Sequence, residues 1–180
     1  LAQSITGATT FDYVIVNDVG LTLNSPCTVN QTLTLTTGLI TTTAANLLTI
    51  ASTGGFATPS SASYITGPLA MVYSATGSKT FPIGKGVGTY RPLTLNYTAL
   101  TGPSTVTAEQ SESGFPGTVP GNDTQLGTRY WHVTQSGGSA YTYNITLNSG
   151  LSSLTTPVIL KYDSPTTLAL SASGTNGAER

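Results

Sequence analysis

Between residues 32 and 43 the chain reads Thr32-Leu-Thr-Leu-Thr-Thr-Gly-Leu-Ile-Thr-Thr-Thr43. Hydroxyl and aliphatic side chains alternate here residue by residue, which places them on opposite faces of a β-strand. β-branched side chains such as threonine and isoleucine also fit the pleated surface of a sheet. The stretch therefore predicts a strand with one apolar face and one face of hydroxyl groups.

The rest of the chain has the same texture. Serine and threonine make up nearly a third of the 180 residues, and 20 glycines and 10 prolines interrupt the pattern every few residues. Such punctuation is typical of short strands joined by turns. Because no segment shows a helical period, the sequence predicts an all-β protein.

Residues 1–56 carry short, evenly spaced candidate strands separated by tight turns, such as those at 17–20, 24–26 and 37–38. Even spacing of this kind predicts a β-solenoid-like part, in which stacked coils bury aliphatic columns and expose threonine columns. The first sheet of a sandwich is the alternative that the pattern leaves open. The candidate strands are 13–16, 20–23, 28–36, 39–42 and 47–50.

Residues 57–180 carry longer candidate strands and longer connections. Residues 93–98 and 141–147 alternate strictly between apolar and polar side chains, as expected of antiparallel strands with one face on a core. We therefore expect an antiparallel β-sandwich with Greek-key-like connections. The candidate strands are 64–73, 91–97, 105–110, 129–134, 141–147, 158–162 and 168–171.

Charged residues are scarce, since they form 7% of the chain against about 25% in ordinary soluble proteins. The six basic residues are scattered, which argues against a nucleic-acid partner. Glu109 and Glu112, the closest carboxylate pair, are expected on opposite faces of a strand. Cys27 stands alone and is expected to be a small buried hydrophobe. The sequence predicts no catalytic residue, metal site or cofactor, and no membrane span.

A series of motifs, in this order, resembles the repeats of very large secreted cell-surface proteins of Bacteroidetes type. The first part consists of Thr10-Phe-Asp-Tyr-Val-Ile-Val-Asn17, Gly20-Leu-Thr-Leu-Asn-Ser-Pro26, Val29-Asn-Gln-Thr-Leu-Thr-Leu-Thr-Thr-Gly38 and Asn46-Leu-Leu-Thr-Ile50. The second part consists of Phe81-Pro-Ile-Gly84, Tyr90-Arg-Pro-Leu-Thr-Leu95 and Arg129-Tyr-Trp131. This resemblance implies a secreted, extracellular protein displayed on the cell surface by a type IX route, with a stalk-like or adhesive role.

The motif residues themselves are expected to be structural. Arg91 is expected to stack on an aromatic ring and to bridge loop carbonyls, and Trp131 to anchor the core. Pro82 and Pro92 fit strand starts, where a missing N–H is tolerated. The full motif set comprises Phe81, Pro82, Gly84, Tyr90, Arg91, Pro92 and Trp131.

These observations predict a non-enzymatic extracellular module that serves as a building block of a surface fibre, sheath or adhesin. We expect it to associate end to end with itself or with neighbouring surface modules. Two alternatives remain at this point. Tyr130 and His132 are candidates for a sugar-stacking platform, which would make the chain a carbohydrate-binding module. Flat threonine ladders around residues 32–43 are the candidate for binding ice or another crystal surface.

Overall fold

The computed structural model of the chain describes residues 3–114, 128–150, 159–163 and 167–170. All regular structure in these residues is β, and none of it is helical. The strands are β1 (Gln3–Ile5), β2 (Thr9–Leu23), β3 (Cys27–Thr41), β4 (Leu48–Ile50), β5 (Gly55–Ala57), β6 (Ile65–Thr66), β7 (Leu69–Tyr73), β8 (Gly77–Phe81), β9 (Ile83–Gly84), β10 (Leu93–Ser111), β11 (Tyr130–Leu147), β12 (Leu160–Asp163) and β13 (Thr167–Leu170).

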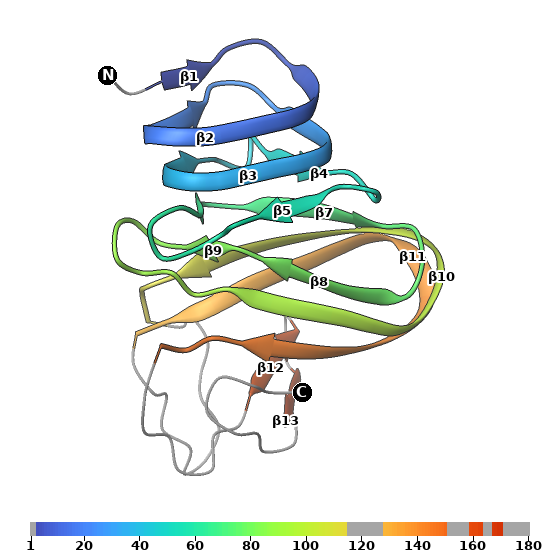
Figure 1. The fold of residues 1–180 in the computed structure, drawn as a ribbon. Helices are drawn as coiled ribbons and strands as arrows, with labels where there is room; N and C mark the ends of the chain where they lie inside the picture. The colour runs from blue at the N-terminus through green and yellow to red at the C-terminus, as the bar shows by residue number, and fades with distance from the viewer. Residues whose placement is uncertain (1–2, 115–127, 151–158, 164–166, 171–180) are drawn as a thin grey trace.

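The N-terminal strands stack in parallel as the coils of a β-solenoid of about four turns (Figure 1). β1 pairs with β2, and β2 pairs with β3. β3 in turn pairs with β4, β5 and β6, and the parallel ladder continues from β4 to β7 and from β6 to β9. The predicted solenoid-like arrangement is confirmed.

Aliphatic columns fill the inside of the stack. Val29 is in register with Phe11 on one side and with Ile50 on the other, and Met71 follows Ile50. Val29, Ile50 and Met71 are at most 2% exposed, whereas Phe11 on the first coil is half-buried. Each coil of a solenoid contacts only its neighbouring coils. The apolar surface that neighbouring coils remove from water is therefore the main stabilisation of the stack.

Glycines allow the long strands to turn corners without breaking the ladder. The sequence predicts turns at residues 17–20 and 37–38. In the structure β2 continues through 17–20 and β3 continues through 37–38, and the pairing of the two strands shifts in register beside Asn17. Gly20 and Gly38 have φ angles of 137° and 86°, which side-chain-bearing residues rarely adopt. Gly38 also packs directly on the backbone of Gly20, so the two glycines form one corner of the stack.

Threonine columns on the outside are shorter than the repeat in the sequence suggests. Thr28 lies in register with Thr10 and Thr49. Thr32, in contrast, lies between Tyr13 and Gly55, so threonine does not recur along its column. The composition of one strand does not fix the composition of a column, because a column takes one residue from each coil.

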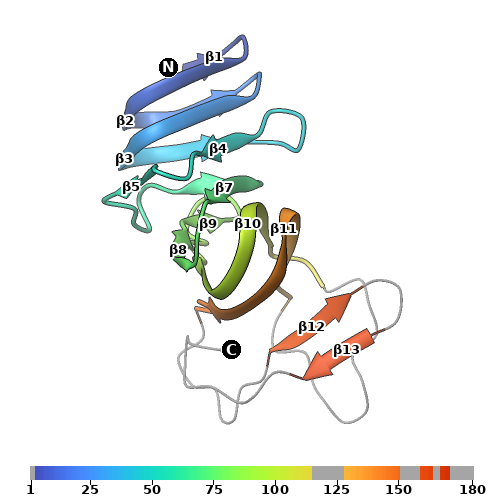
Figure 2. The same ribbon diagram turned by 90° about the vertical axis from the view of Figure 1, so that its right-hand side faces the viewer.

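The predicted β-sandwich of residues 57–180 is not confirmed. β10 pairs antiparallel with both β7 and β8, and β11 pairs antiparallel with β10 along almost its whole length. These strands extend the sheet of the solenoid, which has eleven strands among the described residues, and curve across its end (Figure 2). β10 and β11 alternate between apolar and polar side chains as the sequence predicts, but their apolar faces pack on the core at the last coil of the solenoid.

The remaining described strands, β12 and β13, form a separate antiparallel pair. Leu160 is in register with Leu170, and Asp163 with Thr167. The two strands correspond approximately to the candidate strands 158–162 and 168–171 of the sequence analysis.

Candidate functional site

The Phe81–Gly84 motif leads from the end of β8, which pairs antiparallel with β10, into β9, the last parallel rung of the solenoid. Phe81, Ile83 and Gly84 are buried, and the Pro82 carbonyl accepts a hydrogen bond of 2.9 Å from the Ile65 amide. A Cβ at Gly84 would lie 2.7 Å from the ring of Tyr64. Only glycine therefore lets the chain approach Tyr64 at this position.

Tyr64 and Tyr90 pack against each other beside the loop that follows β9, and Tyr64 binds the backbone of this loop. Their ring centroids lie 5.3 Å apart, and burial raises the pKa of Tyr90. The Tyr64 hydroxyl donates to the Gly86 carbonyl and accepts from the Thr89 amide at 3.1 Å. The predicted motif residue Tyr90 thus contributes to a small aromatic cluster under the loop.

Arg91 lies in a cluster of three charged side chains. Its Nε is 3.6 Å from Glu112 Oε1, and Arg129 Nη2 is 3.6 Å from Glu112 Oε2. Arg91 Nη1 donates to the Tyr90 carbonyl at 3.0 Å, and Gly150 packs closely against the guanidinium group. All three charged side chains are at most 23% exposed. The cluster ties the loop before β10 to the ends of β10 and β11.

The ring-bearing residues at the start of β11 point to different faces of the strand. Trp131 packs half-buried against the core, and its Nε1 donates to the Arg91 carbonyl at 3.1 Å. Tyr130 and His132 alternate with it along the strand, so they share the outward face. Tyr130 is half-buried and His132 is exposed, and His132 lies opposite Glu109 of β10.

The structure brings the motif residues between Phe81 and Trp131 into one region, although they are up to fifty residues apart. Pro92 belongs to the same region, since its carbonyl accepts a hydrogen bond of 3.0 Å from the Asn148 amide. The region is the junction where parallel coils give way to the antiparallel strands β10 and β11. The contacts of the motif residues in this junction join separate strands to one another, so these residues have a structural role.

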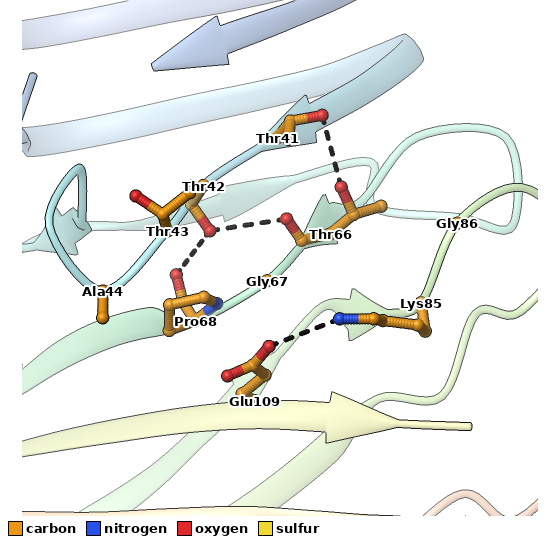
Figure 3. Close-up of a pocket in the computed structure, with 10 residues that line it drawn as sticks. All are labelled: Thr41, Thr42, Thr43, Ala44, Thr66, Gly67, Pro68, Lys85, Gly86 and Glu109. Carbon is orange, nitrogen blue, oxygen red and sulfur yellow. Dashed lines mark hydrogen bonds and ion pairs between the residues drawn. The ribbon is translucent and has the colours of Figure 1, made fainter. Parts of the chain in front are cut away.

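A hollow of about 390 Å³ opens beside this junction (Figure 3). Lys85 Nζ lies 3.6 Å from Glu109 Oε1, and the two side chains are 53% and 36% exposed. The buried Thr42 hydroxyl donates to the Pro68 carbonyl at 2.7 Å, and Thr66 lies beside it. The lining residues are Thr41, Thr42, Thr43, Ala44, Thr66, Gly67, Pro68, Lys85, Gly86 and Glu109.

The lining of this hollow is suited to hydrogen bonding. It presents hydroxyls, carbonyls and one ion pair, and it includes a single carboxylate and neither histidine nor cysteine. Glu112, the second carboxylate considered in the sequence analysis, is held by Arg91 and Arg129 instead. The two glutamates therefore occupy separate ion pairs and do not face one another across the hollow.

Sequence reasoning missed a tyrosine cluster between β7, β10 and β11. Tyr97 lies edge-on to Tyr73 at 4.8 Å, and its ring is 6.1 Å from Tyr141 and 6.3 Å from Tyr143. Lys79 Nζ lies 5.7 Å from the Tyr73 ring centroid. The alternation of Tyr141 with Tyr143 was visible in the sequence, but their partners became evident only from the strand register.

Among the described residues there is no group of three histidine, cysteine, aspartate or glutamate side chains that could hold a metal ion. The same residues include no helix that is long and apolar enough to cross a membrane. Cys27 is buried, and burial raises the pKa of its thiol.

Comparisons with protein-family models, with curated proteins and with solved structures found no match to this chain. The resemblance noted in the sequence therefore has no independent support from them.

Proposed function

We propose that this chain is a non-enzymatic extracellular module, a building block of a cell-surface fibre, sheath or adhesin of the Bacteroidetes type. The observation that carries the proposal is the β-solenoid whose aliphatic columns continue to its first coil. A stack of this kind is a spacer whose last coil is covered here by β10 and β11, and such modules are suited to bearing or displaying other surfaces. Secretion by a type IX route is part of the proposal.

The charged groups support a structural role. Arg91, Glu112 and Arg129 hold strands together at the junction, and Lys85 is paired with Glu109. Acid–base or nucleophilic catalysis needs titratable groups converging on a cavity that could hold a substrate. The hollow near the junction contains one ion pair and several hydroxyls.

The proposal includes association through the first coil of the stack. Phe11 and Val14 on the first coil are half-buried, whereas the residues beneath them, Val29 and Leu33, are at most 1% exposed. A further strand laid on this coil would remove the remaining apolar surface from water. We propose that a second copy of the chain or a neighbouring surface module supplies it.

Electron microscopy of the purified chain tests the proposal. Particles joined end to end, or longer fibres and sheets, are the expected result. Uniformly dispersed single particles, at concentrations up to the solubility limit, would contradict a building-block role.

Carbohydrate binding is the second candidate, and the hydroxyl-lined hollow is the observation that favours it. Lys85 donates and Glu109 accepts hydrogen bonds, which is the combination that sugar hydroxyls require. A glycan array probed with the chain and with its Glu109→Gln variant tests this candidate. Binding by the parent chain that the substitution abolishes would support it, and an array without bound glycans would contradict it.

A further inference from the structure

In the part of the chain that the structure describes, one edge of β2 is largely uncovered. β3 covers one edge of β2, while β1 covers the other edge only at Leu21–Leu23. Among the described residues, no strand pairs with the outer edge of β2 from Thr9 to Val19, and the ribbon above β2 in Figure 1 is β1, which pairs farther along at Leu21–Leu23. An uncovered edge is a template for pairing with another strand.

The direction of the backbone groups at this edge follows from the other coils. The amides of buried Cys27, Ile40 and Ile65 each donate to a carbonyl of the following coil, at distances of 2.9–3.0 Å. In a stack with one direction of winding, inward-facing residues therefore direct their backbone groups to the next coil. By the same geometry, inward-facing Val14 and Val16 bond to β3, and outward-facing residues offer N–H and C=O groups at the open edge.

Large apolar side chains accompany these backbone groups. Tyr13 is 71% exposed and Ile15 is 72% exposed. In the next coil their columns contain Thr32 and Thr34, and in the coil after that Gly55 and Ala57. In these two columns the large apolar side chains are therefore found on β2, and the following coils carry smaller or polar residues.

We propose that two copies of the chain pair through this edge as antiparallel strands, with Val14 on the twofold axis. Tyr13 of one copy then lies opposite Ile15 of the second copy, and the converse pair forms at the same time. Aromatic and β-branched side chains stabilise each other across antiparallel strands. Each of the two pairs also exchanges backbone hydrogen bonds, since both residues offer their groups at the edge.

Charge selects this register over its neighbour. Centring the pair on Ile15 would bring Asp12 of one copy towards Asp18, at the corner of β2, of the other copy, twice in each dimer. Like charges directly opposite one another destabilise a strand pair. Centring on Val14 instead places Asp18 opposite Thr10 of the second copy, which brings no two carboxylates together.

A second copy is the occupant that the observations favour because the joint is self-complementary. A twofold joint uses the same patch on both partners and closes on itself. The inference deepens the proposed association through the first coil and rests on that proposed function. It specifies that the outer edge of β2 pairs and that a second copy of the chain is its partner.

Analytical ultracentrifugation of the full chain across concentration, at low and at molar salt, tests the dimer. We expect a dimer whose stability changes little with salt, because the joint contains backbone bonds and apolar contacts rather than ion pairs. Tyr13→Lys and Ile15→Lys should each raise the dissociation constant by about tenfold or more, since lysine guards open edges. Thr34→Lys, in the same column one coil below, is the matched control and should leave the dimer intact.

Disulfide trapping tests the register. Val14→Cys should give a cross-linked dimer under mild oxidation, because opposed residues on the axis bring their Cβ atoms close enough for a disulfide. The parent chain, whose Cys27 is buried, is the control. Preferential cross-linking of Ile15→Cys would overturn the register.

Two outcomes would overturn the joint itself. One is a parent chain that stays monomeric at every concentration. The other is an assembly that both lysine variants leave unchanged. Fibres seen by microscopy together with that second outcome would leave the proposed function standing and place the association elsewhere on the molecule.

Discussion

Trp131 Nε1 donates a hydrogen bond of 3.1 Å to the backbone carbonyl of Arg91, forty residues away along the chain. The contact links the start of β11 to the loop that precedes β10. It lies beside the ion pairs that Glu112 makes with both Arg91 and Arg129. This junction is therefore the place where the parallel and antiparallel parts of the sheet are joined.

Trp131→Phe should lower the free energy of unfolding by about 1–3 kcal/mol, the range for leaving a buried polar group without its partner. The phenyl ring retains most of the apolar contact and removes the N–H. Trp131→Ala should cost more, towards the lower part of the roughly 3–5 kcal/mol typical of fully buried aromatic residues, because Trp131 is only half-buried. Urea unfolding followed by circular dichroism measures both. Equal stability of the phenylalanine variant and the parent would show that the hydrogen bond contributes nothing.

Arg91→Ala should lower stability by about 1–3 kcal/mol, because it removes the hydrogen bond to the Tyr90 carbonyl and one of the ion pairs of Glu112, which keeps its ion pair with Arg129. Arg91→Lys should restore only part of the loss, since lysine lacks the planar guanidinium fork. Lys85→Ala is the matched control. Its ion pair with Glu109 is exposed, so the expected loss is below about 1 kcal/mol. Melting temperatures that fall equally in the Arg91 and Lys85 alanine variants would contradict this view of the cluster.

Gly38→Ala should destabilise the chain by more than about 1 kcal/mol, because φ at this position is 86° and a Cβ would lie 2.7 Å from the Gly20 amide nitrogen. Gly55→Ala is the control for the loss of glycine itself. No atom lies within 4 Å of a Cβ there, and its φ is not positive. Thermal unfolding of the two variants should therefore differ, and similar midpoints would argue against a strained corner.

Stability should fall as the pH rises above about 10, the ordinary pKa of tyrosine. Burial raises the pKa of Tyr73, Tyr97 and Tyr90 in the folded chain, so the unfolded chain releases these protons first. The folded state then binds more protons than the unfolded state, and linkage makes unfolding easier with each step in pH. Burial lowers the pKa of Lys79, which acts in the opposite direction but concerns a single group.

Tyrosinate absorbance together with circular dichroism measures this effect. The buried tyrosines should ionise only as the fold is lost, so the two signals should change together above pH 10. Tyr73→Phe should weaken the dependence on pH, while removing the hydrogen bond of 2.9 Å to the Leu95 carbonyl. Ionisation of every tyrosine before any loss of the fold would contradict the prediction.

The sequence predicted the solenoid because its evidence is local. Alternation of Thr32 with Leu33 fixes which side chains face inward, and Leu33 is fully buried in the structure. The positions of the corners were also visible as Asn17, Gly20 and Gly38. What the pattern did not show is that the strands pass through these corners unbroken, because a turn and a corner of a coil use the same residues.

Local pattern could not decide how β10 and β11 would use their apolar faces. Leu93 and Leu95 would alternate with polar residues in the same way on a sandwich and on the end of a solenoid. Pairing of β10 with β7 and β8 decided between them, and that pairing joins residues that are distant in sequence. The hollow at Lys85 and Glu109 and the tyrosine cluster have the same origin.

The sequence by itself determined the β class, the inward and outward faces of each strand and the scarcity of groups that could perform chemistry. These properties depend on side-chain type and on the two-residue period of a strand, which neighbouring residues set. Only the tertiary structure decided which strands are neighbours, which charges meet at Glu112 and which edge of β2 stays uncovered. Those features depend on contacts between coils, whose register is set by the packing of the whole stack.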